Sequence, residues 1–324
     1  LARAAVATSC QRIEMDEPAS HPALQAPIDP SRFIMLRELP EGPSGALCQM
    51  RTPEREGGGS VDCLFKSITL MVNQEDLHQI IKEVREWKEV SNHPNITQFY
   101  DCVWDHHHRR LIVISEFMDH FSLREVIRGA AKRRLPEQVA GVIMAQTMAG
   151  LAHLHGKMHR MHRNIKPENI LLNSNGEAKI TDLGQSAKLQ HTLDACNTMI
   201  ASQVYMSPER IQGANYTSNC DVWSIGVVLV EMMTGKHPYD QGAGLEDVHA
   251  VIIAIEEMDP PVLLAHHPEV SESVAALSTK CMVWSREHRP TAAQLMEEDE
   301  WLRSYSMAPD KLAPLISFLS DMRP

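Results

Sequence analysis

The sequence predicts a bilobal α+β fold in which a small β-rich lobe is followed by a larger, mainly α-helical lobe. Up to about Ile114, short runs rich in β-branched and aromatic residues are separated by turns that contain Gly or Pro, and only one helical segment interrupts them. Beyond Met118 the apolar residues recur at helical spacing instead. We therefore expect a five-stranded sheet with one helix, followed by a helical lobe.

The elements of the small lobe follow from local patterns. A helix is predicted over residues 73–91, because its apolar residues fall on one helical face. The strands are predicted at 32–39, 46–50, 61–70, 96–103 and 111–114. Residues 1–31 mix Ala, Pro, Ser and Asp without periodicity and are predicted to be a flexible leader.

The larger lobe is predicted to contain helices at 139–154, 218–233, 275–284 and 292–301. A helical extension is expected over 303–324, where Leu312, Leu315, Ile316 and Leu319 form an i, i+3, i+4, i+7 stripe. That stripe either packs on the large lobe, which we favour, or docks a partner.

Composition excludes several classes of function. The 324-residue chain has a net charge of −11, from 31 basic and 42 acidic residues, which argues against nucleic acid or an anionic membrane as its partner. Its seven cysteines are scattered without a CxxC pair, which indicates free thiols in a reducing cytoplasm or nucleus. The longest apolar stretch, 222–233, is too short to span a bilayer. The sequence does not indicate an oligomeric state.

Chemistry-bearing motifs follow one another in the second half of the chain. They are His162-Arg163-Asn164-Ile165-Lys166-Pro167-Glu168-Asn169, then Asp182-Leu183-Gly184, Met206-Ser207-Pro208-Glu209, Asp221-Val222-Trp223-Ser224 and Arg289-Pro290. In this order they resemble the catalytic loop, the metal-binding motif and the later structural motifs of protein kinases. The resemblance covers roughly residues 33–302, and five motifs in register make a chance match implausible.

The resemblance implies a kinase domain over 32–302, with an N-lobe at 32–115, a hinge at 116–118 and a C-lobe at 119–302. It also implies ATP and Mg²⁺ as cofactors, with Asn169 and Asp182 as metal ligands. The resemblance implies catalytic roles for Asn164, Lys166, Lys66 and Glu83, of which Lys66 and Glu83 are expected to form an ion pair. The nucleotide is expected to contact Gly42, Gly45, Leu47, Leu64, Lys66, Glu116, Met118, Asn169, Leu171 and Asp182.

Several positions depart from the family pattern. Asn164 replaces the aspartate that accepts the substrate's hydroxyl proton, and losing such a base typically lowers the rate about 10²–10⁴-fold. Pro40 replaces the first glycine of the GxGxxG loop, Leu64 stands where the family has Ala above the adenine, and Ala201 replaces a glycine. An engineered Asp→Asn change would leave the rest intact, so we favour natural drift under relaxed catalytic constraint.

The activation segment resembles that of the MAP kinase kinases, specifically the plant type. Thr192 and Thr198 follow an S/T-x5-S/T spacing. The resemblance implies that an upstream kinase phosphorylates both threonines, and that Arg163 receives such a phosphate. Upstream and downstream kinases of a MAP-kinase cascade are the implied partners, although residues 1–31 contain no basic-aliphatic docking motif.

Three functional hypotheses follow. We favour an ATP-binding, catalytically impaired kinase that serves as a scaffold or allosteric partner in signalling. The alternative is a slow but active Ser/Thr or dual-specificity kinase that phosphorylates a MAP kinase, because Ser202 keeps the hydroxyl that such enzymes place beside the catalytic loop. A weaker third hypothesis is a decoy that is phosphorylated without passing the signal on.

Residues 105–108, Asp-His-His-His, offer metal-ligand chemistry outside these motifs. Consecutive histidines on a strand point to opposite faces and do not converge easily on one ion. A solvated turn between two strands is therefore favoured over a metal site.

Overall fold

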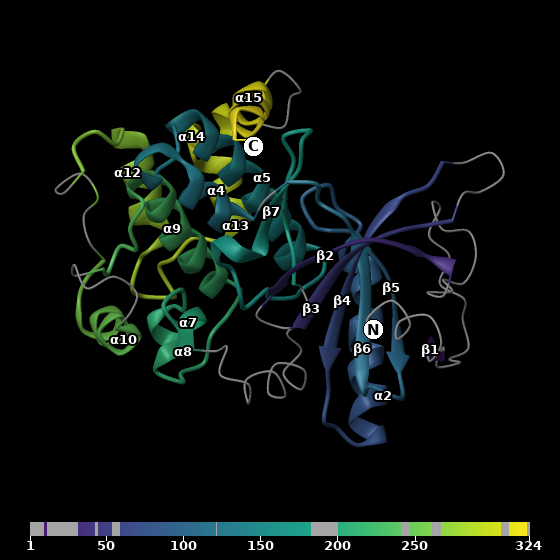
Figure 1. Cartoon of the computed structure of the whole chain (residues 1–324). Helices are drawn as coiled ribbons and strands as arrows, with labels where there is room; N and C mark the ends of the chain where they lie inside the picture. Colours follow the sequence, from purple (N-terminus) through teal and green to yellow (C-terminus); the bar gives the residue numbers. More distant parts are fainter. Residues whose placement is uncertain are drawn as a thin grey trace. The chain divides into compact units, whose positions relative to one another are not determined.

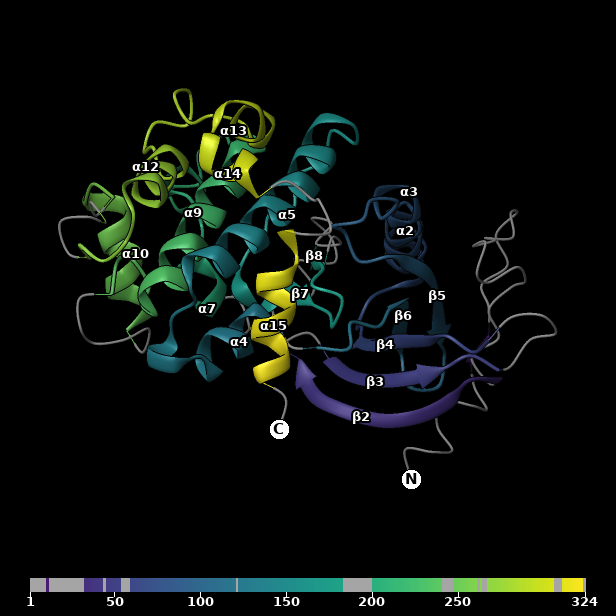
Figure 2. The ribbon, with the colours of Figure 1, turned by 90° about the horizontal axis from the view of Figure 1, so that it is seen from above.

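The computed structural model of the chain (Figures 1 and 2) describes residues 10–11, 32–42, 45–53, 59–120, 122–182, 200–240, 247–260, 263, 267–305 and 311–322. These residues form two compact units. The first unit contains the described residues up to Asn92 together with Thr97–Met118. The second contains His93–Ile96 and the described residues from Asp119 onward.

An antiparallel sheet forms the first unit, with the strand order β1-β5-β6-β4-β3-β2. Its strands are β1 (Cys10–Gln11), β2 (Ile34–Gly42), β3 (Gly45–Arg51), β4 (Asp62–Thr69), β5 (Phe99–Asp105) and β6 (Arg110–Glu116). The five predicted strands are confirmed. The two-residue β1, which pairs with the edge of β5, was not predicted, because it lies in the leader, whose other residues are outside the described ones.

One face of this sheet is covered by the helix α2 (Gln74–Arg85), as Figure 1 shows. The side chain of Asn73 caps its first turn by accepting a hydrogen bond from the Asp76 amide at 2.8 Å. The buried residues of α2, including Ile80 and Val84, pack in a common apolar cluster with β5 and β6. The predicted helix ends earlier than expected, since a separate short helix, α3 (Trp87–Val90), follows Glu86.

The second unit is mainly helical. Two long helices, α5 (Glu137–Gly156) and α9 (Asn219–Thr234), supply much of its core, and every residue of α9 from Cys220 to Met233 is buried. The other helices are α4 (Leu123–Gly129), α7 (Ile200–Gln203), α8 (Pro208–Ile211), α10 (Val248–Glu257), α12 (Glu272–Cys281), α13 (Ala292–Glu298) and α14 (Glu300–Ser304), with 3-10 turns at η2 (Ala131–Arg133) and η3 (Pro167–Asn169). A two-stranded ribbon, β7 (Ile170–Leu172) with β8 (Ala178–Ile180), follows the η3 turn.

The C-terminal helix α15 (Ala313–Asp321) lies beside α5 in Figure 2. Leu315 and Leu319 belong to the core of the second unit, and Ile316 lies against Gly176 in the β7–β8 turn. The apolar stripe therefore packs on the helical unit, as favoured from the sequence.

The His-rich segment forms the turn between β5 and β6, as expected. Asp105 accepts the backbone N–H groups of His107 and His108 and pairs with the His108 ring at 2.8 Å. Elsewhere, the five cysteines that the structure describes outside β1 are unpaired thiols. Within the described ranges, no helix has both the length and the apolar character needed to cross a membrane.

Candidate active site

Asp221, at the start of α9, anchors the segment that carries the catalytic-loop motif. Its fully buried carboxylate accepts the backbone N–H of His162 at 2.7 Å and that of Arg163 at 2.8 Å. The His155 ring lies 2.9 Å from the same carboxylate. Burial acts to raise the pKa of Asp221, but His155 and the backbone donors hold it below its ordinary value. The loop is thus fixed through its backbone.

Main-chain hydrogen bonds hold Asn164 in this loop. Its carbonyl accepts the side-chain amide of the buried Asn169 at 2.8 Å, and its N–H donates to Nδ1 of His162 at 3.3 Å. Among the described residues, its side-chain amide makes no hydrogen bond of its own. Two positions further on, the buried Lys166 donates from Nζ to the Ser202 hydroxyl at 2.7 Å.

A second set of backbone bonds ties the catalytic loop to the segment before Asp182. The N–H of Thr181 donates to the Asn169 carbonyl at 3.0 Å, and Nε2 of His162 donates to the Thr181 carbonyl at 2.8 Å. Because its other nitrogen accepts from Asn164, the His162 ring is neutral, and burial lowers its pKa. Asp182 itself has a left-handed backbone, with φ of 62°. Such strain in a non-glycine residue is typical of functional sites.

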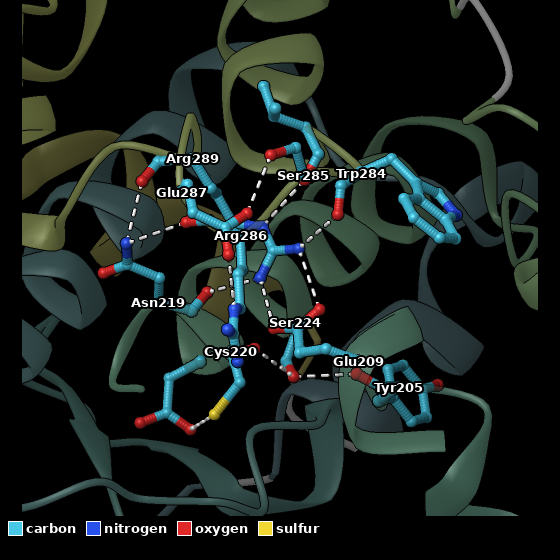
Figure 3. A network of polar contacts seen from close by, with 12 residues as sticks. Tyr205, Glu209, Asn219, Cys220, Ser224, Trp284, Ser285, Arg286, Glu287 and Arg289 are labelled. Carbon is cyan, nitrogen blue, oxygen red and sulfur yellow. Dashed lines mark hydrogen bonds and ion pairs between the residues drawn. The ribbon is translucent and has the colours of Figure 1, made fainter. Parts of the chain in front are cut away.

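The pair of Glu209 and Arg289 closes a buried polar network, drawn in Figure 3. Both guanidinium Nη atoms bind the carboxylate, at 2.8 and 3.1 Å, and other Arg289 donors reach the carbonyls of Val283, Trp284 and Asn219. The Trp223 ring lies 5.2 Å from Cζ of Arg289. Burial alone would raise the pKa of Glu209, but the bonds from Arg289 keep it below its ordinary value. The pair thus joins two of the motifs found in the sequence, residues 206–209 and 289–290.

A second buried cluster was not foreseen from the sequence. Arg124, on α4, donates to Glu168 at 2.7 Å and also binds Glu231 and the Tyr205 hydroxyl. That hydroxyl donates in turn to Glu231 at 2.7 Å. The cluster joins α4 and α9 to Glu168, two residues after Lys166. Arg124 follows an N-cap serine, and no pattern around it signals such partners.

In the first unit, one prediction is wrong. Glu83 on α2 does not form the expected ion pair with Lys66 on β4. Its Oε1 accepts from Gln79, one turn earlier on the helix, at 3.2 Å, and its Oε2 is buried without a hydrogen-bond partner. Lys66 is engaged in another interaction. The motif identifies both residues, but their pairing depends on how α2 is placed against β4.

The glycine-loop residues stand at the β2–β3 turn, where Gly42 and Gly45 are register partners. Gly45 has φ of +136°, and a Cβ there would lie 2.0 Å from the Ser67 carbonyl oxygen, so only glycine fits. Pro40 lies within β2.

The remaining predicted nucleotide contacts are divided between the two units. In the first, Leu47 is the strand partner of Lys66, Leu64 lies on β4, Met118 is buried, and the Glu116 carboxylate accepts the Gln98 N–H at 3.1 Å. In the second, Leu171 lies on β7.

Comparison with known proteins decides the family. Residues 38–302 match the protein kinase domain. The chain is 31% identical over 304 residues to mitogen-activated protein kinase kinase 2 of Arabidopsis thaliana, which covers 90% of this chain and 80% of that protein. The chain belongs to the protein kinase family, among the MAP kinase kinases.

Other relatives of this kinase domain are similar over shorter stretches. Dual specificity mitogen-activated protein kinase kinase 1 of Dictyostelium discoideum is 38% identical over 205 residues, and mitogen-activated protein kinase kinase 3 of Arabidopsis thaliana is 32% identical over 223 residues. These matches cover 63% and 69% of this chain, but only 30% and 42% of the two relatives.

Membership of the kinase family implies the use of ATP and Mg²⁺, and the residues present fit the metal. The side-chain nitrogen of Asn169 is committed to the Asn164 carbonyl, which leaves the amide oxygen as the ligand atom. Asp182 adds a carboxylate, and Thr181 links the two segments through its bond to Asn169. Oxygen donors of these kinds are what Mg²⁺ prefers. Thr192, Thr198, Leu183 and Gly184 lie outside the described residues, so the phosphorylation sites stay a prediction.

Proposed function

We propose that this MAP kinase kinase homologue binds ATP but is catalytically impaired, and that it acts as a scaffold or allosteric partner of other kinases in a MAP-kinase cascade. One observation carries the proposal: the catalytic loop is fully anchored around Asn164, whose side chain is a hydrogen-bond acceptor but a negligible base. The loop keeps its anchoring hydrogen bonds but lacks the side chain that would accept the substrate's proton.

The contacts of Asn164 support loss of the base without loss of the fold. The described contacts of Asn164 are made by its backbone, so replacing a carboxylate by an amide removes charge and leaves those hydrogen bonds in place. The contact of Glu83 with Gln79 leaves α2 without the lysine–glutamate pair that phosphoryl transfer requires. Asn169 and Asp182 would hold Mg²⁺, which would supply positive charge against the phosphates, and Lys166 would position the transferred group.

The free thiols support a reducing compartment, which we propose is the cytoplasm or nucleus. The upstream and downstream kinases of a cascade are proposed as partners on the likeness to the MAP kinase kinases alone.

Two measurements on the full chain test the proposal. A thermal-shift titration with ATP, with and without Mg²⁺, is expected to raise the melting temperature of the wild type, because a ligand that binds the native state stabilises it by mass action. Asp182→Asn is the matched control, and it should weaken the Mg²⁺-dependent part of the shift. Absence of any shift in the wild type contradicts nucleotide binding.

Phosphate transfer is measured with radiolabelled ATP and a recombinant MAP kinase. We expect the wild type to give a rate close to that of the Lys66→Met variant, which lacks the phosphate-binding lysine. A wild-type rate well above that control, and comparable to the rates of active family members, contradicts the impairment.

A slow, active Ser/Thr kinase is the second candidate, and one contact favours it. Lys166 and Ser202 form a 2.7 Å hydrogen bond beside the catalytic loop, so the lysine is already positioned. Positioning and electrostatics supply most of the catalysis in phosphoryl transfer, so some turnover survives loss of the base. A weak rate that both Lys66→Met and Lys166→Met abolish would favour this candidate over the impaired scaffold.

A further inference from the structure

Tyr216, in the loop between α8 and α9, is the accessible tyrosine of this chain. The sequence contains five tyrosines, and the structure describes all of them. Tyr100, Tyr205 and Tyr239 are at most 8% exposed, whereas Tyr216 is 36% exposed. Tyr305 is partly covered, because its ring lies against Gly141 and Trp301. A modifying enzyme that acts on the folded protein therefore reaches Tyr216 first.

Two arginines lie against the ring of Tyr216. Cζ of Arg163 is 6.0 Å from the ring centroid and Cζ of Arg210 is 5.5 Å from it, within the range of cation–π contacts. Arg210 is itself held by a 2.6 Å hydrogen bond from Nη1 to the Arg163 carbonyl. Nε of Arg163 is buried without a hydrogen-bond partner. The Tyr216 ring is thus flanked by guanidinium groups, one of which has a donor to spare.

The described contacts of these two guanidinium groups are with the Tyr216 ring and the Arg163 carbonyl, and none is with a carboxylate. Within the described part of the chain, neither Arg163 nor Arg210 forms an ion pair. The two nearby acids are committed elsewhere: Asp221 binds backbone N–H groups and His155, and Glu209 binds Arg289. Among the described residues, the result is a local excess of positive charge in a chain whose net charge is −11. Such a position favours an anion.

We propose that Tyr216 is a phosphorylation site whose phosphate is held by Arg163 and Arg210. A phosphotyrosine carries three acceptor oxygens and a charge of about −1.5 to −2. Arginine forks bind phosphate oxygens in pairs, and both side chains already lie beside the ring that would carry the phosphate. In the reaction, Oη of Tyr216 forms a bond to the γ-phosphorus of ATP held by a tyrosine-directed kinase. The bond from that phosphorus to ADP breaks, and the phenolic proton passes to that kinase's base.

The modification would act on the catalytic loop through Arg163, which directly precedes Asn164. A phosphate on Tyr216 would hold the Arg163 side chain, and with it the residue that precedes Asn164, at the α8–α9 loop. This inference does not depend on whether the chain itself transfers phosphate.

The test begins by treating the folded full chain with a broad-specificity tyrosine kinase and ATP, and mapping the product by mass spectrometry. We expect Tyr216 to be the main modified tyrosine, and Tyr216→Phe to remove most of the label. The second pKa of the phosphate on Tyr216 is then measured by a pH titration followed with phosphorus-31 NMR. Adjacent guanidinium groups should lower its second pKa by about one unit or more from the ordinary value near 6.

Variants of Arg210 make the test specific. Arg210→Met is expected to return the phosphate pKa towards 6, whereas Arg210→Lys, which keeps the charge but loses the fork, should give an intermediate value. A melting temperature is measured for each variant to show that it is folded. If Arg210→Met does not fold, Arg210→Lys is used as the only test variant. The proposal is overturned if other tyrosines are modified in place of Tyr216. It is also overturned if the phosphate on Tyr216 titrates as an exposed phosphotyrosine does in the wild type.

Discussion

Replacing Arg289 by Met is expected to cause a large loss of stability that becomes smaller in acid. The Arg289 side chain is fully buried and binds both oxygens of Glu209, whose own side chain is 9% exposed. Met approximates the length of the side chain but has no donors. The variant therefore leaves a carboxylate buried without its cation, and it also removes the donors to the carbonyls of Val283, Trp284 and Asn219.

Removing one partner of a buried ion pair costs about 3–5 kcal/mol. For domains of 150–250 residues, each kcal/mol shifts the melting temperature by about 2–4 °C, so we expect a fall of roughly 10 °C at pH 7. In the wild type the pKa of Glu209 is lowered, so the stability it contributes is present above its ordinary pKa and is lost as the pH falls through the lower, folded value. In the variant the unpaired, buried carboxylate should have a raised pKa, and its protonation in mild acid should narrow the difference from wild type.

Thermal melts at pH 7 and pH 5 measure both effects. Arg286→Met is the matched control, because Arg286 lies three residues before Arg289 but pairs with the exposed Glu287. Since exposed ion pairs contribute little to stability, this variant should melt like the wild type. The double variant Glu209→Gln/Arg289→Met should lose less than the two single losses added together. A structural role for the buried pair is contradicted if Arg289→Met melts like Arg286→Met, or if the deficit in its melting temperature does not change with pH.

Three further predictions concern the candidate site and its surroundings. Asn164→Asp should raise phosphate transfer without restoring the rate of an active kinase, and full restoration would show that the other departures do not matter. Glu83→Gln should leave the melting temperature of the nucleotide-free protein unchanged or higher, because Oε2 of Glu83 is buried without a partner; a clear fall would indicate a cationic partner in solution. His237 donates to the Val204 carbonyl and accepts the Tyr239 N–H as a neutral ring, and burial lowers its pKa to about 4. Stability should therefore fall as the pH drops from 6.5 to 4, by about 3 kcal/mol from this residue, and His237→Gln should flatten that part of a pH-dependent denaturation series.

Local pattern was sufficient to predict most of the fold. Runs of β-branched and aromatic residues between turns located β2 to β6, and helical periodicity located α5, α9 and α12. The break between α2 and α3 was missed, since the apolar spacing continues through it and marks no end at Glu86.

Residues of the candidate site could be proposed from the sequence where a motif is contiguous, whereas contacts between residues far apart in the chain were missed. The contiguous motif of residues 162–169 identified Asn164, Lys166 and Asn169 directly. In contrast, the partners of Arg124 lie 44, 81 and 107 residues away, and nothing near Arg124 signals them. Glu83 shows a third case: sequence finds the residue, but the direction of its carboxylate depends on packing of α2.

The retained motifs differ in what they say about activity. Asp221 and the Glu209–Arg289 pair are buried groups whose hydrogen bonds hold the second unit together, so selection for a stable fold alone would keep them. Asn164 is under no such constraint, because its described contacts come from its backbone. Chemistry at this position can therefore be lost while the fold is kept. It follows that Asn164→Asp should change the rate of phosphate transfer without changing the melting temperature. Arg289→Met should lower the melting temperature without changing the rate of phosphate transfer per unit of folded protein.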